Sequence, residues 1–396
     1  MNVYADNAAT TRMSQTALDA VRDCMENTWG NPSSLYETGQ KAKTALEQAR
    51  ERVAAALNAL PGEILFTSGG SEADNQAIRG AAALGKAKGK THIISTTIEH
   101  HAVLHTLKRL EREGFTVTLL PVDAEGLVTA RQVAEAIRDD TCLVTVMYAN
   151  NEIGTVEPIA EIGAVCRERG VLFHTDAVQA AGHLPVDVKA DNVDLLSLSG
   201  HKFHGPKGVG ALYVRRGVRI PPLIEGGAQE RGKRAGTENL AGIAGMAAAL
   251  SEAAEHMEEN AERQLHTRER LIEGISRIPH CVLNGDRERR LPGNVNFCFE
   301  GIEGESLLLL LDDKGIAASS GSACTSGSLE PSHVLLAIGR PHEIAHGSLR
   351  LTVDENVSDA DADYLIDAVA SGVERLRAMS PVWRDLIAGK KSFVTK

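Results

Sequence analysis

The sequence predicts an α/β protein with a large domain on a mostly parallel sheet and a smaller α+β domain at the C-terminus. Three observations predict it. Short runs of Val, Ile, Leu and Thr alternate with segments of helical period over about 150 residues, as when helices cover both faces of a sheet. After about Gly236 the pattern changes to long helical segments with few strands. The length of 396 residues also suits two or three domains.

The expected strands of the large domain are continuous apolar runs, as in buried strands of a parallel sheet. They cover residues 64–67, 92–95, 116–121, 143–147, 171–175, 195–198 and 211–214. Helices are expected between them, near 72–86, 101–113, 131–138 and 159–169. The C-terminal part predicts one long helix over 241–273, a strand at 294–299, a helix at 305–312, strands before Ser319 and near 348–353, and an amphipathic helix at about 359–378.

Composition excludes several classes of protein. The chain has 42 basic and 53 acidic residues and a net charge of −11, whereas general nucleic-acid binding needs clustered Lys and Arg. No run approaches the roughly 18 apolar residues of a membrane-spanning helix. The start, MNVYADNAATT, lacks the basic and apolar regions of a secretory signal. Six cysteines without CxxC pairs indicate reduced thiols. We therefore expect a cytoplasmic protein that requires neither nucleic acid nor a membrane.

The segment SGGSEADN at 68–75 directly follows the expected strand at 64–67. Two glycines and then a capped helix point backbone N–H groups outward, which is an arrangement that binds phosphate. An ordinary tight turn with a Ser cap fits the spacing equally well. The basic segment GKAKGKT at 85–91 is one residue short of a Walker A loop and precedes a strand, so it predicts a surface turn.

The segment HEIAH at 342–346 matches the HExxH pattern of zinc enzymes. Pro341 and Gly347 confine it to little more than one helical turn, so exposed capping histidines are the better interpretation. His101 and His105 share a helix face, but the sequence shows no third ligand for a metal there.

Two segments beyond buried strands carry candidate cofactor ligands. Asp176, in HTDAVQ, ends the strand at 171–175, where α/β sheets bind ligands, although a helix N-cap is the alternative. Lys202, in SLSGHKFHGPKG, follows the strand at 195–198 among small residues and histidines. A desolvated lysine amine can form a Schiff base there. The same segment also fits an ordinary surface lysine in a polar loop.

Cys324 differs from the other five cysteines. It lies in SSGSACTSGS at 319–328, a segment too polar to be core. A thiol in such a loop of a cytosolic protein is either accidental or reactive, and we expect a reactive one.

Together these motifs resemble the pyridoxal-phosphate cysteine desulfurases of the NifS/IscS class. The shared segments occur in the family's order over essentially the whole chain: YADNAATT, GNPSS, FTSGGSEADN, EHHAVL, NNEIG, HTDAVQ, SLSGHKFHGPKGVGALY, RAGTEN and SSGSACTSGSLEPSHVL. The resemblance implies the PLP-dependent transferase fold type I with a seven-stranded sheet. It also implies an N-terminal segment (1–15) packing with the small domain, a large PLP-binding domain (16–260) and a small domain (261–396) that carries the catalytic Cys loop.

The resemblance assigns the catalytic roles. Lys202 would carry the pyridoxal 5'-phosphate, Asp176 would pair with its ring nitrogen, and Gln179 would bind its ring hydroxyl. His100 would stack on the ring and move protons. Cys324 would accept the sulfur.

The resemblance also implies ligands for the phosphate and the substrate. The phosphate would be held by Ser71, Glu72 through its backbone amide, Ser199, His201 and, across the subunit interface, Thr237. Many relatives have Thr in place of Ser71, and the hydroxyl is kept. The substrate would be held by Asn151 and Arg350. Asn151 would also be a cofactor ligand.

The implied reaction converts L-cysteine to L-alanine and leaves a persulfide on Cys324, for delivery to an iron–sulfur scaffold protein of the NifU/IscU type. The resemblance implies that the enzyme is a homodimer. The segments RAGTEN and SPVWRDL favour the nitrogen-fixation type of the family. Cys324 could also be an iron–sulfur ligand shared with the scaffold. Two alternatives stay open. An aminotransferase or lyase would share Lys202 and Asp176 without needing Cys324. A protein holding iron–sulfur clusters or zinc is disfavoured by the scattered cysteines.

Overall fold

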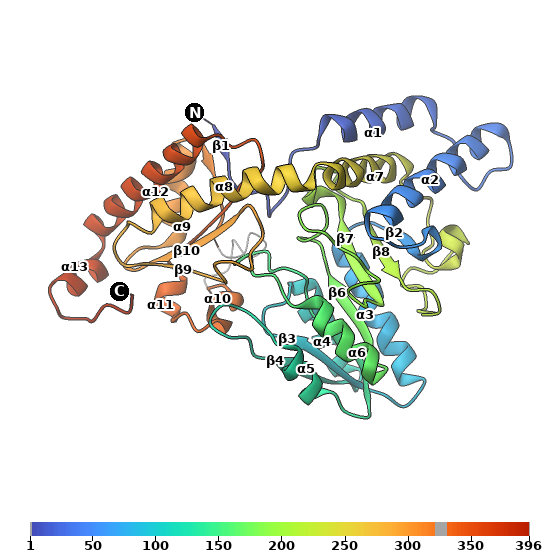
Figure 1. Ribbon diagram of the computed structural model, residues 1–396, viewed down its shortest axis with the longest axis horizontal. Coiled ribbons are helices and arrows are strands. Elements are labelled where there is room, and N and C mark those ends of the chain that lie inside the picture. The colour runs from blue at the N-terminus through green and yellow to red at the C-terminus, as the bar shows by residue number, and fades with distance from the viewer. Residues whose placement is uncertain (1, 321–330, 396) are drawn as a thin grey trace.

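The computed structural model describes residues 2–320 and 331–395 in two packed units (Figure 1). One unit surrounds a large sheet, and the other contains the C-terminal elements, at the left of Figure 1. Helices α7 (Leu240–Glu255) and α8 (Met257–Ile275) run in succession across the upper half of this view, below α1 (Gln15–Asn27), and join the two units. Each unit has its own hydrophobic cluster of buried side chains.

The large sheet has seven strands in the order β2-β8-β7-β6-β5-β3-β4. They are β2 (Ile64–Thr67), β3 (His92–Thr96), β4 (Thr116–Leu120), β5 (Thr141–Thr145), β6 (Leu172–Asp176), β7 (Leu195–Ser199) and β8 (Gly210–Val214). All neighbours are parallel except β8, which is antiparallel to β2 and β7. The predicted fold class is therefore confirmed. Strand β5 lies two residues earlier than predicted, because the chain leaves the sheet before Met147, which lines a cavity.

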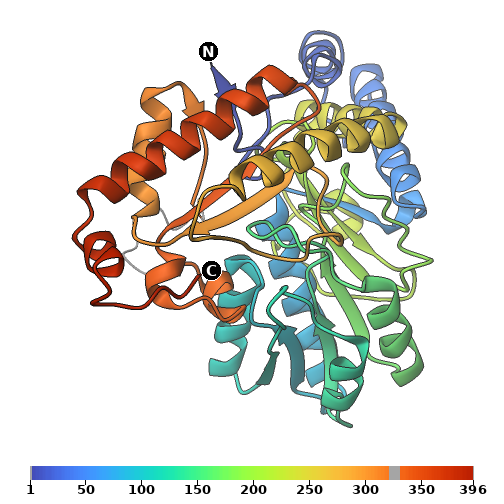
Figure 2. The ribbon, with the colours of Figure 1, turned by 60° about the vertical axis from the view of Figure 1, so that its left-hand side comes forward.

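Four predicted helices of this unit are present: α3 (Gly70–Lys86), α4 (His101–Arg112), α5 (Ala130–Ala136) and α6 (Ile159–Arg169). Two helices that were not predicted, α1 (Gln15–Asn27) and α2 (Glu37–Ala56), pack against α7. Figure 2 shows both of them, in blue, beside α7. Among the described residues, no helix combines the length and the apolar character needed to cross a bilayer.

The smaller unit contains a three-stranded antiparallel sheet in the order β12-β10-β9. Its strands are β9 (Cys281–Leu283), β10 (Asn294–Phe299) and β12 (Ser348–Thr352). Helices α8, α9 (Gly304–Asp313) and α12 (Asp359–Met379) share a buried apolar cluster with this sheet. Three short helices complete the unit: α10 (His333–Ala337), α11 (His342–Ala345) and α13 (Pro381–Ile387). The HEIAH segment forms α11, so it has the single turn that was expected.

The single helix predicted over 241–273 is wrong, because the chain forms two helices there. The break is at His256, whose φ of −103° and ψ of 12° are not helical. Helix α7 packs on α1 and α2, whereas α8 packs on α12 and β10. The helix therefore breaks where its packing partners change, and no Gly or Pro marks that point in the sequence.

The N-terminal segment contacts both units. Strand β1 (Val3–Tyr4) pairs in parallel with β11 (Ile316–Ala317), and Asp6 forms a bridge with Thr352. Further on, the Thr11 N–H donates to the carbonyl of His201 in the larger unit, at 2.9 Å. The predicted domain division at residues 15/16 and 260/261 stays a prediction, and its second boundary falls inside α8.

Candidate active site

A cavity of about 270 Å³ lies between the two units, at the carboxyl ends of β6 and β7. The carboxyl ends of parallel strands are where α/β sheets bind ligands. The smaller unit contributes Arg350 and His333 to its wall. Nine of the predicted site residues line this cavity: Ser71, His100, Asn151, Asp176, Gln179, Ser199, His201, Lys202 and Arg350.

Three predicted residues are not in that wall. The side chain of Glu72 accepts hydrogen bonds from the backbone N–H of Ser68 and from Arg234 Nε, each at 2.9 Å. Thr237 is exposed and does not line the cavity of its own chain. Cys324 lies outside the described residues.

Lys202 ends a short 3-10 turn, Gly200–Lys202, that directly follows β7. Its Nζ donates to the carbonyl oxygens of Ala8 at 2.6 Å and Ala9 at 2.8 Å. Gln179 Nε2 also donates to the Ala8 carbonyl, at 3.0 Å. The N-terminal segment is therefore part of the site, because its carbonyl groups orient the lysine amine.

His100 is the N-cap of α4, and its Nδ1 accepts a hydrogen bond from the Ala102 N–H at 3.1 Å. Burial, together with the nearby Lys202 amine, lowers the pKa of His100 to about 4. The ring is consequently neutral near pH 7 and has the capacity to accept a proton. Burial also lowers the pKa of His201 to about 4, and its Nδ1 is hydrogen-bonded to Thr10 Oγ1 at 3.1 Å.

Asp176 ends β6, and its Oδ1 accepts a hydrogen bond from the Val178 N–H at 2.9 Å. Burial raises the pKa of Asp176 to about 6, while that hydrogen bond and the charge of Lys202 act in the opposite direction. A buried carboxylate in this position matches a protonated ring nitrogen, because the ion pair would offset the cost of burying the charge.

The turn from β2 into α3 forms a cradle for an anion. The 17-residue helix begins at Gly70, and Gly70 and Ser71 line the cavity. Gly69 has a φ of 152°, and a Cβ on Gly70 would lie 2.6 Å from Val178 Cγ2. The backbone amides at the helix start, together with the Ser71 and Ser199 hydroxyls, are the donors that a phosphate needs.

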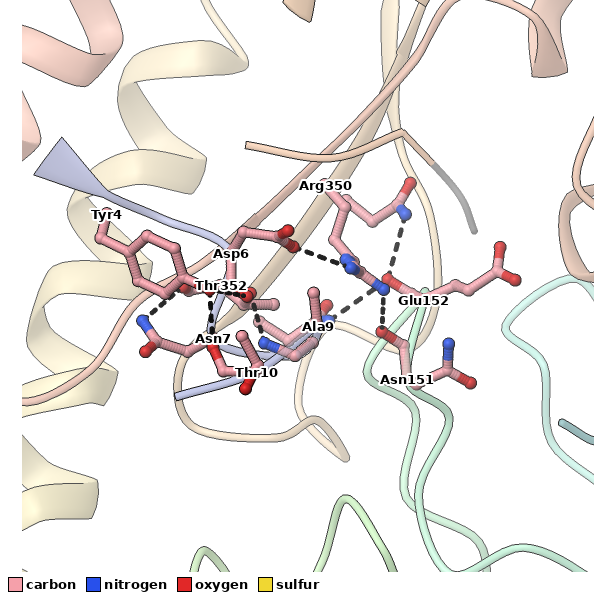
Figure 3. A network of polar contacts seen from close by, with 12 residues as sticks. Tyr4, Asp6, Asn7, Ala9, Thr10, Asn151, Glu152, Arg350 and Thr352 are labelled. Atoms are coloured by element: carbon pink, nitrogen blue, oxygen red, sulfur yellow. Dashed lines mark hydrogen bonds and ion pairs between the residues drawn. The ribbon is translucent and has the colours of Figure 1, made fainter. Parts of the chain in front are cut away.

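Arg350, on β12, reaches the cavity from the smaller unit (Figure 3). It is 1% exposed, its Nη2 donates to Asp6 Oδ1 and its Nη1 donates to the Asn151 carbonyl, both at 2.9 Å. Its buried Nε has no partner. A buried donor without a partner costs about 1–3 kcal/mol. A carboxylate ligand in the cavity would supply the missing acceptor.

The segment that carries Cys324 is attached to the cavity at both ends. On one side, the Ser319 N–H donates to the Arg350 carbonyl at 3.2 Å, and the Arg350 N–H donates in return at 2.6 Å. On the other side, His333 lines the cavity, and its Nε2 is hydrogen-bonded to the Glu99 carbonyl at 3.0 Å.

The five cysteines within the described residues have weakly acidic thiols. Burial raises the pKa of Cys142 and Cys298 to about 11 and that of Cys166 to about 12. Burial also raises the pKa of Cys24 and Cys281. Because the thiolate is the nucleophile, these five are poor candidates for sulfur chemistry. Of the six cysteines, Cys324 is thus the remaining candidate for the sulfur chemistry.

Sequence reasoning missed Asp74, which lines the cavity from α3. Oxygen or nitrogen atoms of Asp74, His100 and Asp176 lie within 4.8 Å of one another. Asp74 is four residues after Gly70, and this helical spacing would have placed it on the same face as the anion cradle. The distances alone would suit a cation as well as the ring nitrogen of a cofactor.

Comparison with known proteins decides between these ligands. Residues 3–365 match the class-V aminotransferase family, and the chain belongs to this family, whose members use pyridoxal phosphate. The chain is 57% identical over 392 residues to a cysteine desulfurase IscS of Clostridium botulinum (strain Hall), covering 98% of each chain. Within the family, the protein is a member of the cysteine desulfurases.

Solved structures agree. A NifS-like protein is 38% identical with a TM-score of 0.89, covering 95% of this chain and 100% of its own. SspA in complex with cysteine is 40% identical with a TM-score of 0.79, covering 89% and 99%. The cavity fits pyridoxal phosphate, because it offers an amine in Lys202, a buried carboxylate in Asp176 and a helix N-terminus for the phosphate. The predicted family and cofactor are confirmed, and the role of each residue stays a prediction.

Proposed function

We propose that the protein removes sulfur from L-cysteine, holds it as a persulfide on Cys324 and passes it to an iron–sulfur scaffold protein of the NifU/IscU type. One observation carries the proposal. Residues on both sides of the segment with Cys324 adjoin the cavity that contains Lys202, Asp176 and Arg350, because Ser319 pairs with the Arg350 backbone and His333 lines the wall. The cysteine bound by the related SspA supports cysteine as the substrate.

The binding step follows from Arg350 and Asn151. The planar guanidinium of Arg350 has an unpartnered N–H, and we propose that it binds the substrate carboxylate. Asn151 lines the same wall and fixes the guanidinium through its carbonyl. When bound, pyridoxal phosphate supplies an electron sink that stabilises negative charge at the substrate Cα.

The chain's own groups move the protons. The amine of Lys202, once uncharged, accepts the α-proton of the substrate, and Asp176 keeps the ring nitrogen protonated. Burial lowers the pKa of His100 to about 4, so its ring is neutral near pH 7. Because a base this weak does not hold the proton of a thiol, we propose that the ring passes the Cys324 proton on rather than storing it.

In the sulfur step, the Cys324 thiolate attacks the substrate Sγ. The S–S bond forms as the Cβ–Sγ bond breaks, and its electron pair stays with carbon, which takes up protons and leaves as L-alanine. Carbon is reduced by two electrons and sulfur is oxidised by two. Cys324 is four residues from Ser320, and four extended residues span at most about 14 Å. This reach matches a sulfur carrier that visits both the cavity and an acceptor protein.

Exposed apolar side chains support a homodimer. Trp29, Leu35 and Tyr36, at the turn between α1 and α2, are 72%, 93% and 65% exposed. Such clustered exposure is typical of a surface that another chain covers. We propose that Thr237, exposed in its own chain, binds the phosphate in the partner's site. The three-part domain division, the nitrogen-fixation type and a cluster-ligating role for Cys324 stay predictions.

Product stoichiometry tests the reaction. With L-cysteine and a thiol reductant, which supplies the two electrons that release sulfide, we expect alanine and sulfide in equal amounts. Pyruvate and ammonia with sulfide would mean β-elimination and would overturn the role of Cys324. Cys324→Ala should abolish turnover while L-cysteine still perturbs the cofactor absorbance. The matched control is Cys281→Ala, a half-buried thiol that does not line the cavity and should keep activity. An aminotransferase would keep its activity in both variants.

Mixed dimers test Thr237. In a dimer of one Lys202→Ala chain and one Thr237→Ala chain, one site receives both intact residues only if Thr237 acts across the interface. Mixing the two inactive proteins under exchange should therefore restore up to one active site per mixed dimer. If activity does not rise on mixing, in dimers shown to exchange chains, Thr237 does not act in the partner's site.

Transfer of ³⁵S from L-cysteine through Cys324 to an isolated scaffold protein tests the delivery step, and a scaffold that stays unlabelled would refute it.

A further inference from the structure

A row of polar side chains crosses the otherwise apolar sheet beneath the cavity. Thr145, His174 and Ser197 lie on the neighbouring strands β5, β6 and β7, and all three are fully buried. Thr145 Oγ1 is 2.8 Å from His174 Nδ1, and His174 Nε2 is 3.0 Å from Ser197 Oγ. Ser197 in turn lies close enough to Asp74 to lower the pKa of that carboxyl. The proposed reaction does not use this row.

The hydrogen bonds of the row fit one assignment of donors and acceptors if the Ser197 hydroxyl is directed at Asp74. Burial lowers the pKa of His174 to about 3, so its ring is neutral and carries a single N–H. The Ser197 oxygen then accepts from His174 Nε2–H, and His174 Nδ1 accepts from the Thr145 hydroxyl. This tautomer is assigned from the network. In this set the row favours an ionised Asp74, whereas a protonated Asp74 that donates to Ser197 reverses every donor in the row.

The other side of Asp74 faces the proposed cofactor ligands. Asp74 is 1% exposed and lines the cavity, and atoms of Asp74 and Asp176 lie within 4.8 Å. Asp74 Oδ1 has no hydrogen-bond partner and is 3.7 Å from His174 Nε2. Two buried carboxyl groups this close share protons, because ionising both is unfavourable. Burial, Asp176 and Glu99 raise the pKa of Asp74 and outweigh Ser197, which lowers it. The charge of Lys202 and the hydrogen bond from the Val178 N–H lower the pKa of Asp176.

We propose that Asp74 is a positioning residue that carries the single proton of the Asp74–Asp176 pair, so that Asp176 stays ionised toward the cofactor ring nitrogen. The second part rests on the role proposed for Asp176. The first part, a protonated Asp74, is a property of the chain itself and is testable without cofactor or substrate.

Infrared difference spectroscopy tests the proton directly. At pH 7, the spectrum of the wild-type chain minus that of Asp74→Asn should contain the carbonyl band of a protonated carboxylic acid, shifted in heavy water. Loss of an ionised carboxylate band instead would overturn the proposal. Glu113→Gln is the control, since this carboxyl pairs with Arg109 at the surface and should lose the ionised band. A failure of the desulfurase reaction would leave this result unaffected.

Two variants test what the proton does for the loaded enzyme. Asp74→Asn keeps an uncharged donor, so the pKa of the Lys202-linked chromophore should stay within about 0.3 units of wild type. An ionised Asp74 would predict a fall of more than about one unit on removing its charge. Asp74→Val removes the polar group, and we expect roughly tenfold weaker cofactor binding that Asn largely restores. Equal impairment in Asn and Val, with thermal stability unchanged, would refute the proposal.

Discussion

Replacing Glu230 with Gln would leave a buried guanidinium without its main counter-charge. The side chains of Arg50 and Glu230 are each 2% exposed and are joined by two hydrogen bonds, at 2.7 and 2.8 Å. Arg50 also donates to the Ile64 carbonyl, and Glu230 accepts from the Phe66 N–H, both at 3.0 Å. Glu47, the other carboxylate at Arg50, is half exposed and 3.3 Å away.

Removing one partner of a buried ion pair costs about 3–5 kcal/mol. We expect about 3 kcal/mol here, because Gln keeps an oxygen for the Phe66 N–H and Glu47 remains. Unfolding entropy of about 2.1 cal/mol/K per residue gives about 0.8 kcal/mol/K for a chain of 396 residues. The melting temperature should therefore fall by about 4 °C if the chain unfolds as one unit.

Differential scanning calorimetry at fixed protein concentration measures this shift, since dimer dissociation would make it concentration-dependent. The control is Glu135→Gln, which breaks a 3.7 Å pair with Arg131 between side chains that are both exposed. Exposed pairs contribute little, so this control should leave the melting temperature unchanged. The reasoning is refuted if the Glu230→Gln shift is no larger than that of Glu135→Gln.

Three further changes test the site and its surroundings. In Gly70→Ala the new Cβ would crowd Val178, and because overpacking costs about 1–3 kcal/mol, cofactor affinity in a fluorescence titration should fall about fivefold or more. Arg350→Lys loses the planar fork, so steady-state kinetics should show KM for L-cysteine rising about tenfold to a hundredfold, with a smaller change in kcat. Burial raises the pKa of Glu99 to about 8, above an unfolded value of about 4.3. Its protonated form therefore stabilises the fold fully below about pH 4.3, and this contribution is lost as the pH rises through 8. Glu99→Gln should flatten the pH dependence of the melting temperature in that window.

Each of these expectations has a contradicting result. Gly62→Ala is a control for Gly70→Ala, because its Cβ would meet only Arg231 Nη1 at an ordinary 3.6 Å. If the two variants lose cofactor affinity equally, crowding of Val178 by the new Cβ is not the cause of the loss. A fall in kcat at constant KM would move Arg350 from binding to chemistry. An unchanged pH slope in Glu99→Gln would mean that this carboxyl does not titrate there.

The strands were predictable because burial on both faces of a sheet leaves continuous apolar runs such as ILFT at 64–67. Helix α2 was missed even though it buries Ala42, Leu46, Ala49 and Val53 at helical spacing. Alanine contributes little to an apolar pattern, so the buried face of α2 is hard to recognise in the sequence. The break at His256 was not predictable, because its cause is a change of packing partner rather than a local breaker residue.

For the site, the quoted motifs contain eight of the nine predicted residues that the fold brings to one cavity, although they come from distant parts of the chain. The ninth, Arg350, lies outside those motifs. Asp74 was missed because a carboxyl inside a helix is usually exposed, and only the fold shows that Asp176 lies beside it. Thr237 does not line the cavity of its own chain, so the structure of one chain does not test the role proposed for it in a second copy.

The position of the N-terminal segment has a consequence for the order in which the protein is made. The Asn7 N–H and side chain bond to the Thr352 carbonyl, 345 residues away, and the Thr352 N–H bonds to Ala5 at 2.7 Å. Residues 5–7 are synthesised long before Thr352, so these contacts form only after Thr352 has been made. Such distant contacts form slowly, whereas the large sheet needs none of them. We therefore expect a nascent chain to form its sheet before the Ala8 carbonyl that orients Lys202 is in place, so that capture of the cofactor follows the synthesis of Thr352.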